Sequence, residues 1–170
     1  EDACYDFERL GLERIIESLD DSYHIVTKWH PALYNNIRIG KCKLPDLTSE
    51  NLKNRITDVS AYGDINDVLT ISDILVTDYS SVIFDYFLLD RPVIYFIYDK
   101  DEYSRSRGLY FDFKDYIYGE TASDSDELLA AIKAENMHNE LRKNFNEKFL
   151  KACDGNSTSR VVKWVFEGDR

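Results

Sequence analysis

Two short runs of apolar residues flank a polar segment near the middle of the chain, between residues 74 and 96. The first run falls within residues 73–78 and the second within residues 93–98, and a helical pattern over 80–90 separates them. Both runs are continuously apolar rather than alternating, which is typical of strands covered on both faces. A strand, a helix and a second such strand form a right-handed crossover in a parallel sheet. This feature therefore predicts an α/β fold, with a Rossmann-like parallel sheet flanked by helices.

The rest of the chain continues the alternation of helices and strands. Further patterns predict helices over 5–19, 65–72, 124–136, 138–153 and 158–168, and strands over 23–30 and 55–60. Asp64 is a suitable N-cap for the helix over 65–72, and Pro92 ends the helix over 80–90. Residues 99–122 are expected to be irregular. The length of 170 residues is that of one domain with a real core.

The overall charge and the cysteines exclude several kinds of protein. The net charge of −11 argues against a general nucleic-acid or anionic-membrane surface, although a small anionic ligand remains compatible with it. The longest apolar stretches are well below the roughly 20 residues that a membrane span needs. Cys4, Cys42 and Cys153 match no zinc-binding spacing, and we expect them to be free thiols in a reducing cytosol.

The polar segment Asp78-Tyr79-Ser80-Ser81 is the first candidate binding site. It follows a buried strand, and ligands of open parallel sheets bind beyond the carboxyl ends of the strands. It also begins a helix, whose first N–H groups lack internal partners and lie at the positive end of the helix dipole. A phosphate group suits such a place, and the hydroxyls of Ser80 and Ser81 can add donors. The alternative is an ordinary serine N-cap, with Asp78 holding the loop.

Three more residues are candidates for the same site. Asp85 lies four residues after Ser81, so it shares the face of the helix opening and could accept hydrogen bonds from the two hydroxyls of a ribose. A salt bridge to a neighbouring cation is the alternative. His30 ends the strand over 23–30, at the same expected edge, where it could donate to a phosphate or pack as a loop residue. Arg107 lies in the irregular, aromatic-rich segment, and such loops often carry function.

These residues together resemble the CDP-glycerol glycerophosphotransferase family, which includes the teichoic acid primases and polymerases. The similar motifs are "KWHP" at 28–31, "SDILVTDYSSVIFDY" at 72–86, "RPVIYFIYDKDEY" at 91–103, "RGLYFDF" at 107–113 and "DGNST" at 154–158. The resemblance implies the C-terminal, donor-binding half of a two-domain GT-B enzyme, so residues 1–170 would be a fragment. It also implies that His30 meets the donor diphosphate as the catalytic residue, that Ser80 and Ser81 bind phosphate, and that Asp85 binds ribose.

The implied reaction transfers glycerol phosphate from CDP-glycerol, or another polyol phosphate from a related CDP-polyol, to a lipid-linked polymer acceptor held by the missing N-terminal half. No segment matches the family's second histidine motif, so we expect this chain to bind donor without turnover. We expect no metal and no further cofactor, no nucleic-acid partner, and a cytoplasmic location at the inner face of a bacterial membrane. The alternatives are a CDP-ribitol or nucleotide-sugar GT-B domain and a non-catalytic nucleotide-binding module.

Overall fold

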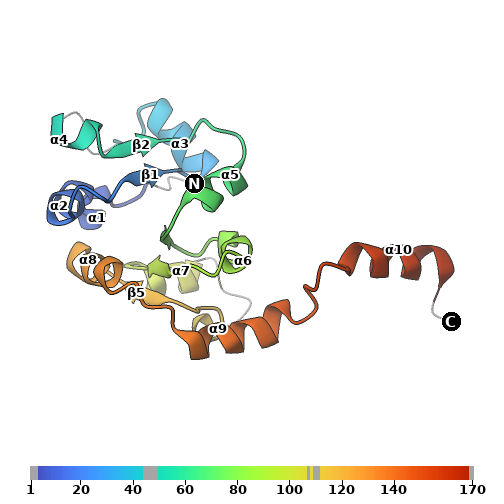
Figure 1. The fold of residues 1–170 in the computed structure, drawn as a ribbon. Coiled ribbons are helices and arrows are strands. Elements are labelled where there is room, and N and C mark those ends of the chain that lie inside the picture. Colours follow the sequence, from blue (N-terminus) through green and yellow to red (C-terminus); the bar gives the residue numbers. More distant parts are fainter. Residues whose placement is uncertain (1–3, 44–49, 107, 109–111, 169–170) are drawn as a thin grey trace.

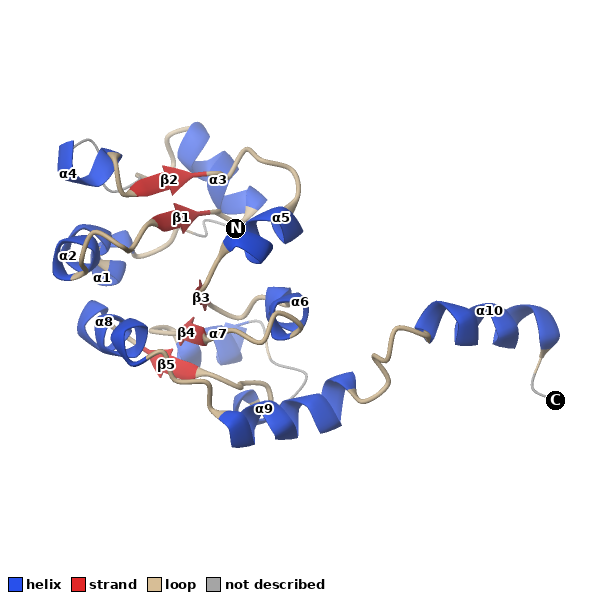
Figure 2. Cartoon of the chain, viewed as in Figure 1, coloured by secondary structure: helices blue, strands red, loops and turns tan. Residues whose placement is uncertain are grey.

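Five short parallel strands form the centre of the part of the chain that the structure describes. The computed structural model describes residues 4–43, 50–106, 108 and 112–168. In one sheet, β1 (Ile25–Thr27) pairs with β2 (Ile56–Asp58); in the other, the order is β3 (Leu75–Thr77), β4 (Val93–Phe96) and β5 (Glu120–Ala122). All three pairings are parallel, as the sequence predicts. In the described residues the strands form two sheets rather than one, stacked in the order β2, β1, β3, β4, β5 in Figure 2.

Helices surround the strands, as Figure 1 shows. The α-helices are α1 (Phe7–Leu10), α2 (Leu12–Ser18), α3 (Pro31–Arg38), α4 (Glu50–Lys53), α5 (Ile65–Ile71), α6 (Val82–Phe87), α7 (Lys100–Ser106), α8 (Ser125–Ala134), α9 (Asn139–Phe145) and α10 (Ser157–Glu167). A 3₁₀ turn (Phe113–Asp115) precedes β5, and a π-helical turn (Asn146–Leu150) extends α9.

The four residues of β4 divide the core into two layers, because successive side chains of a strand point to opposite faces. All four are buried. Ile94 and Phe96 pack with residues of α1, α2 and α8, whereas Val93 and Tyr95 pack with residues of α5, α6 and α9. This arrangement confirms the expectation, from the continuously apolar run, that helices cover both faces of the sheet.

The structure corrects several predicted elements. The helix over 5–19 is broken in two by Gly11, whose left-handed φ of 60° ends α1 and whose N–H donates to the carbonyl of Phe7. Residues 31–38 form α3, because Pro31 takes the first helical position, where its missing N–H costs nothing. The segment over 99–122 is not irregular throughout, since it contains α7, the 3₁₀ turn and β5.

The cysteine prediction is wrong for two of the three residues. Cys4 and Cys42 are joined by a disulfide, with their Cα atoms 5.6 Å apart, whereas Cys153 is free and exposed. A separation of 38 residues gives no sign in the sequence that the fold brings the two together.

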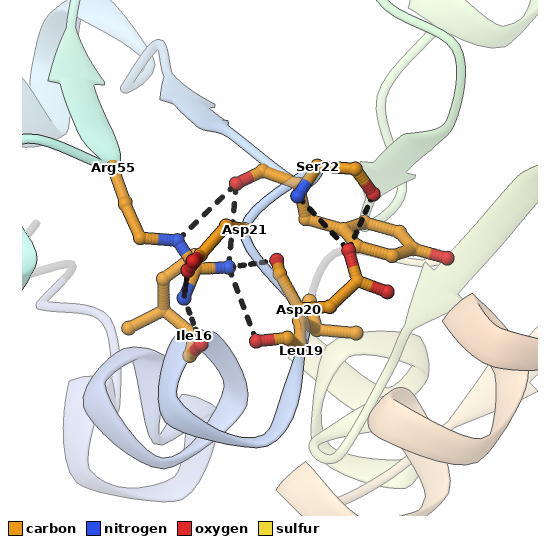
Figure 3. A network of polar contacts seen from close by, with 7 residues as sticks. Ile16, Leu19, Asp20, Asp21, Ser22 and Arg55 are labelled. Carbon is orange, nitrogen blue, oxygen red and sulfur yellow. Dashed lines mark hydrogen bonds and ion pairs between the residues drawn. The ribbon is translucent and has the colours of Figure 1, made fainter.

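One side chain fastens the end of α2 to the strand β2. The guanidinium of Arg55 donates to the carbonyl oxygens of Ile16 at 3.0 Å and Leu19 at 3.1 Å, and also to that of Asp20 (Figure 3). Its Nε donates to the carbonyl of Tyr23 at 3.4 Å, just before β1 begins. Arg55 therefore satisfies carbonyl groups that the end of a helix leaves without partners.

The last helix, α10, extends away from the rest of the protein (Figure 1). Every residue of this helix is exposed, and its large apolar side chains are Val161, Val162, Trp164, Val165 and Phe166. Among the described residues, no helix is both long and apolar enough to cross a membrane.

Candidate functional site

Acidic residues follow two neighbouring strands at the carboxyl edge of the three-stranded sheet. Asp78 comes directly after β3, and Asp99 follows β4. The hydroxyl of Tyr79 donates to Oδ1 of Asp99 at 2.9 Å and so joins the two loops. The ring of Tyr79 also stacks on Tyr103 of α7, with 3.8 Å between the ring centroids. The parallel topology therefore produces a fixed polar edge at the place the sequence indicates.

The surroundings of Asp78 disfavour its charged form. Burial of the carboxyl group raises its pKa above the ordinary value, and the nearby carboxylate of Asp99 raises it further. Its own backbone N–H, that of Tyr79, and the positive charge that His30 carries when protonated act in the opposite direction. His30 comes 48 positions earlier in the chain, yet it lies within electrostatic range of Asp78.

His30 is the N-cap of α3. Its Nδ1 accepts a hydrogen bond from the backbone N–H of Ala32 at 3.2 Å, and the side chain is exposed. A neutral imidazole that accepts at Nδ1 carries its proton on Nε2. The Nε2–H group of His30 is therefore left as a hydrogen-bond donor for a ligand, such as a phosphate oxygen that gains negative charge.

The two serines of the polar segment have different roles at the start of α6. The Oγ of Ser80 accepts a hydrogen bond from the N–H of Val82 at 3.3 Å. Ser81 occupies the N-cap position, but its side chain makes no capping hydrogen bond and is exposed. The ordinary-cap alternative thus describes Ser80, whereas Ser81 keeps its hydroxyl for another partner.

Asp85 lies in the first turn of α6 and is exposed. It makes no ion pair with any residue that the structure describes, so the salt-bridge alternative gains no support there. Arg107 lies outside the described residues. The roles of Asp78, Ser80, Ser81, Asp85 and Arg107 in binding, and of His30 in catalysis, stay predictions.

Aromatic residues that the sequence reasoning missed border this edge. The ring of Tyr5 lies 6.5 Å from Trp29, 6.4 Å from Phe96 and 5.6 Å from Tyr98, centroid to centroid. Burial raises the pKa of the Tyr5 hydroxyl, and the negative charges of Asp78 and Asp99 add to the effect. Asp99 was also missed, although the same strand-end argument that identified Asp78 would have found it.

The described surface has depressions in at least two places. One, of about 410 Å³, is lined by residues 97–102 and Arg105, next to the Asp78 and Asp99 edge. The other, of about 510 Å³, lies beyond α9 and is lined by Asn146, Glu147, Leu150, Lys151 and Cys153. The predicted site residues line neither depression, but Asp99 lines the smaller one, which therefore adjoins the strand edge.

Comparison with known proteins decides the family. The family model for CDP-glycerol:poly(glycerophosphate) glycerophosphotransferases matches residues 2–167. The chain belongs to this glycerophosphotransferase family. The match covers all of the elements described above, including the strand edge and α10.

Individual teichoic acid enzymes are also similar in sequence to this chain, in agreement with the family model. The teichoic acid poly(ribitol-phosphate) polymerase of Bacillus spizizenii is 36% identical over 163 residues, which are 96% of this chain and 25% of the relative. The teichoic acid glycerol-phosphate transferase of Staphylococcus aureus is 33% identical over 98% of this chain and 41% of the relative. The chain thus spans well under half the length of these relatives.

A solved structure supports the fold class. The wall teichoic acid polymerase TagF superimposes with a TM-score of 0.70 and 28% identity, over 94% of this chain and 38% of the TagF chain. A TagF variant soaked with CDPG gives a TM-score of 0.71 at 26% identity, over 98% of this chain and 39% of that one. The described domain therefore has the α/β architecture of one part of a GT-B protein.

Proposed function

We propose that this chain is the donor-binding part of a transferase that moves glycerol phosphate, or a related polyol phosphate, from a CDP-polyol to a cell-envelope polymer. The proposal rests on the polar edge where Asp78 follows β3 and Ser80 and Ser81 begin α6, with His30 within electrostatic range. The family name includes CDP-glycerol, and the relatives act in teichoic acid synthesis with glycerol phosphate or ribitol phosphate.

The chemistry of this transfer suits the residues present. An acceptor oxygen forms a bond to the phosphorus of the polyol phosphate, and the bond from that phosphorus to the CMP oxygen breaks. Catalysis of phosphoryl transfer is mostly positioning and charge stabilisation. The Nε2–H of His30 would donate to the departing CMP phosphate, where negative charge develops. Ser81 and the first N–H groups of α6 would hold the diphosphate, and Asp85 would accept from the ribose hydroxyls.

The acceptor side of the reaction lies outside this chain in the proposal. The acceptor hydroxyl must lose a proton, and the residue that takes it would belong to an N-terminal half together with the binding site for a lipid-linked acceptor. The whole enzyme would then work in the cytoplasm, at the inner face of the membrane. The chain by itself would bind donor and release no CMP at an enzymatic rate.

Calorimetric titration of the chain in EDTA tests the donor part of the proposal. The ligands are CDP, CDP-glycerol, CDP-ribitol, UDP and a UDP-sugar. We expect saturable binding of the cytidine compounds and weaker binding of the uridine compounds. Ser81→Ala and Asp85→Asn should each weaken CDP binding about tenfold, the loss of one hydrogen bond to a charged group.

Matched controls separate site effects from general ones. Ser159→Ala changes an exposed serine of α10, and Asp73→Asn removes an exposed carboxylate just before β3, at the opposite end of that strand. Both should leave CDP affinity unchanged. Tighter binding of a UDP-sugar than of CDP would favour a nucleotide-sugar transferase instead, and a folded chain that binds none of the five compounds would contradict the donor site.

A further inference from the structure

Two of the three cysteines lie where a covalent link would reach the candidate site. Cys4 precedes α1 and Cys42 follows α3, and their Cα distance of 5.6 Å is within the usual range for a disulfide. Cys4 is exposed, whereas Cys42 is only 6% exposed. One partner of the pair is thus accessible to a reagent in solution and the other is protected.

We propose that Cys4 and Cys42 form a reversible disulfide that fastens the N-terminal segment and α3 to the strand edge, so that the redox state of the pair sets how firmly His30 is held. The effect on donor binding and the reversibility expected in the cytoplasm rest on the function proposed above, whereas the disulfide itself and its effect on His30 do not.

The residues after Cys4 lie against the site. Tyr5 contacts the ring of Trp29, the residue before His30, and lies close enough to Asp78 and Asp99 to feel their charges. The backbone N–H of Asp6 donates to the hydroxyl of Tyr98 at 3.2 Å. Holding Cys4 in place therefore holds Tyr5 against the carboxyl edge of the sheet.

The other end of the link is fixed to the helix that His30 begins. The N–H groups of Lys41 and Cys42 both donate to the carbonyl of Asn36 in α3, at 2.9 and 3.3 Å. No residue of α3 is fully buried, and the helix packs on the core only through the half-buried side chains of Leu33 and Ile37, so few buried contacts hold it. A covalent tie near its C-terminal end therefore has a large effect on how precisely its N-terminal His30 is positioned.

Formation of the link needs a two-electron oxidant, which we take to be a small-molecule disulfide such as oxidised glutathione. The thiolate of Cys4 attacks one sulfur of that compound and releases one thiol, and the Cys42 thiolate then attacks the mixed disulfide and releases the second thiol. The two protein thiols lose two protons and two electrons, and the oxidant becomes two thiols. Intracellular disulfides are commonly redox-sensing rather than permanent.

Thiol counting tests the disulfide in the full chain carrying Cys153→Ser, which leaves this pair alone. After equilibration with oxidised glutathione, alkylation should label no cysteine. After reduction, alkylation should label two cysteines, and mass spectrometry reads both results.

The unfolding temperature should be higher in the oxidised state by on the order of 5–10 °C, because the link closes a long loop in the unfolded chain. Cys42→Ser in the same background should show no such redox shift. Two alkylated thiols after oxidation, or a stable glutathione adduct on Cys4, would overturn the proposal.

The effect of the disulfide on His30 is measured separately, by NMR. The imidazole NMR signal of His30, assigned with His30→Gln, should differ between the oxidised and reduced states, while that of His24 should not. CDP should bind several-fold more tightly to the oxidised state. If the His30 signal changes but neither state binds CDP, the function proposed above fails and the redox link stands. An unchanged His30 signal would overturn the link to the site even if the disulfide forms.

Discussion

Arg55 shows how much one side chain can hold in this protein. Arg55→Met keeps most of the apolar stem but leaves several carbonyl oxygens at the end of α2 without a donor (Figure 3). We expect a loss of about 2–4 kcal/mol in the free energy of unfolding, since bonds from a charged donor are worth about 1.5–3 kcal/mol each and do not add fully. Urea denaturation measures this loss.

Arg14→Met is the matched control for Arg55. Arg14 is also an arginine of the α2 region and pairs with Asp126, but its side chain is 59% exposed. An exposed pair contributes at most about 1 kcal/mol, so this variant should be nearly as stable as the unsubstituted chain. Equal losses for the two variants would mean that the carbonyl contacts of Arg55 contribute little.

The raised pKa of Asp78 predicts how the stability of the fold changes with pH. Its pKa is raised in the folded protein, so between the ordinary pKa of an aspartate and this higher value the folded state binds more protons than the unfolded state. Stability contributed at this site therefore falls as the pH rises through that window. Asp78→Asn, which keeps an acceptor oxygen, should be more stable than the unsubstituted chain at pH 7, and this advantage should shrink toward pH 3.5.

Thermal unfolding at several pH values checks the sign of the Asp78 effect. Asp73→Asn removes an exposed charge at the other end of β3 and should show no comparable gain at pH 7. If Asp78→Asn were less stable than the unsubstituted chain at pH 7, the carboxylate would be stabilising the fold instead. A stabilising substitution here would fit a residue kept for binding rather than for folding.

At the scale of single elements, Gly119 decides whether β5 can lie beside β4. A Cβ at this position would come 2.0 Å from the carbonyl oxygen of Val93, which is far closer than two atoms can approach. Gly119→Ala should therefore force the strands apart and cost about 1–3 kcal/mol, or more if the backbone cannot shift. The free energy of unfolding of the purified variant measures this cost.

Gly63→Ala is the control for Gly119. A Cβ at Gly63 meets none of the described atoms within 4 Å, so this variant should match the unsubstituted chain or gain up to about 1 kcal/mol from a stiffer unfolded chain. If Gly119→Ala behaved like Gly63→Ala, β5 would not lie against β4 as described.

Gly119 also shows why some elements could be predicted from the sequence and others could not. The apolar run of β4 and the N-cap of α5 at Asp64 are local signals, and both predictions are confirmed. The strand β5 has the sequence Glu-Thr-Ala, which shows no apolar pattern. Its position beside β4 depends on the close approach at Gly119, and the sequence of the strand itself does not indicate this. Likewise, the disulfide depends on a long-range contact that no local pattern encodes.

Some residues of the candidate site could likewise be predicted from local patterns, and others could not. The strand-end position of Asp78, and its place just before α6, followed from local patterns and parallel topology. That His30 shares this edge with Ser80 and Ser81 stays a prediction, although His30 lies within electrostatic range of Asp78. Tyr5 was missed because its part in the edge depends on packing between distant segments, whereas the strand-end argument would have found Asp99.

At the scale of the whole molecule, α10 differs from the helix of a compact domain because it lies apart from the core. The helix extends from the body with all of its residues exposed, and Phe166 is 82% exposed (Figure 1). Contiguous exposed apolar side chains promote association in water. We therefore expect the chain to self-associate with rising concentration, and the double variant Trp164→Glu, Phe166→Glu to reduce this association strongly in sedimentation velocity.

The same double variant should leave the free energy of unfolding within about 0.5 kcal/mol of the unsubstituted chain, since surface substitutions away from packed contacts rarely do more. Phe145→Ala is the contrasting variant, because Phe145 is only 1% exposed and lies in the second core layer. Removing that ring should cost about 3–5 kcal/mol. A loss of similar size for the α10 variant would mean that this helix packs against its own domain in solution, and its apolar face would then be part of the core.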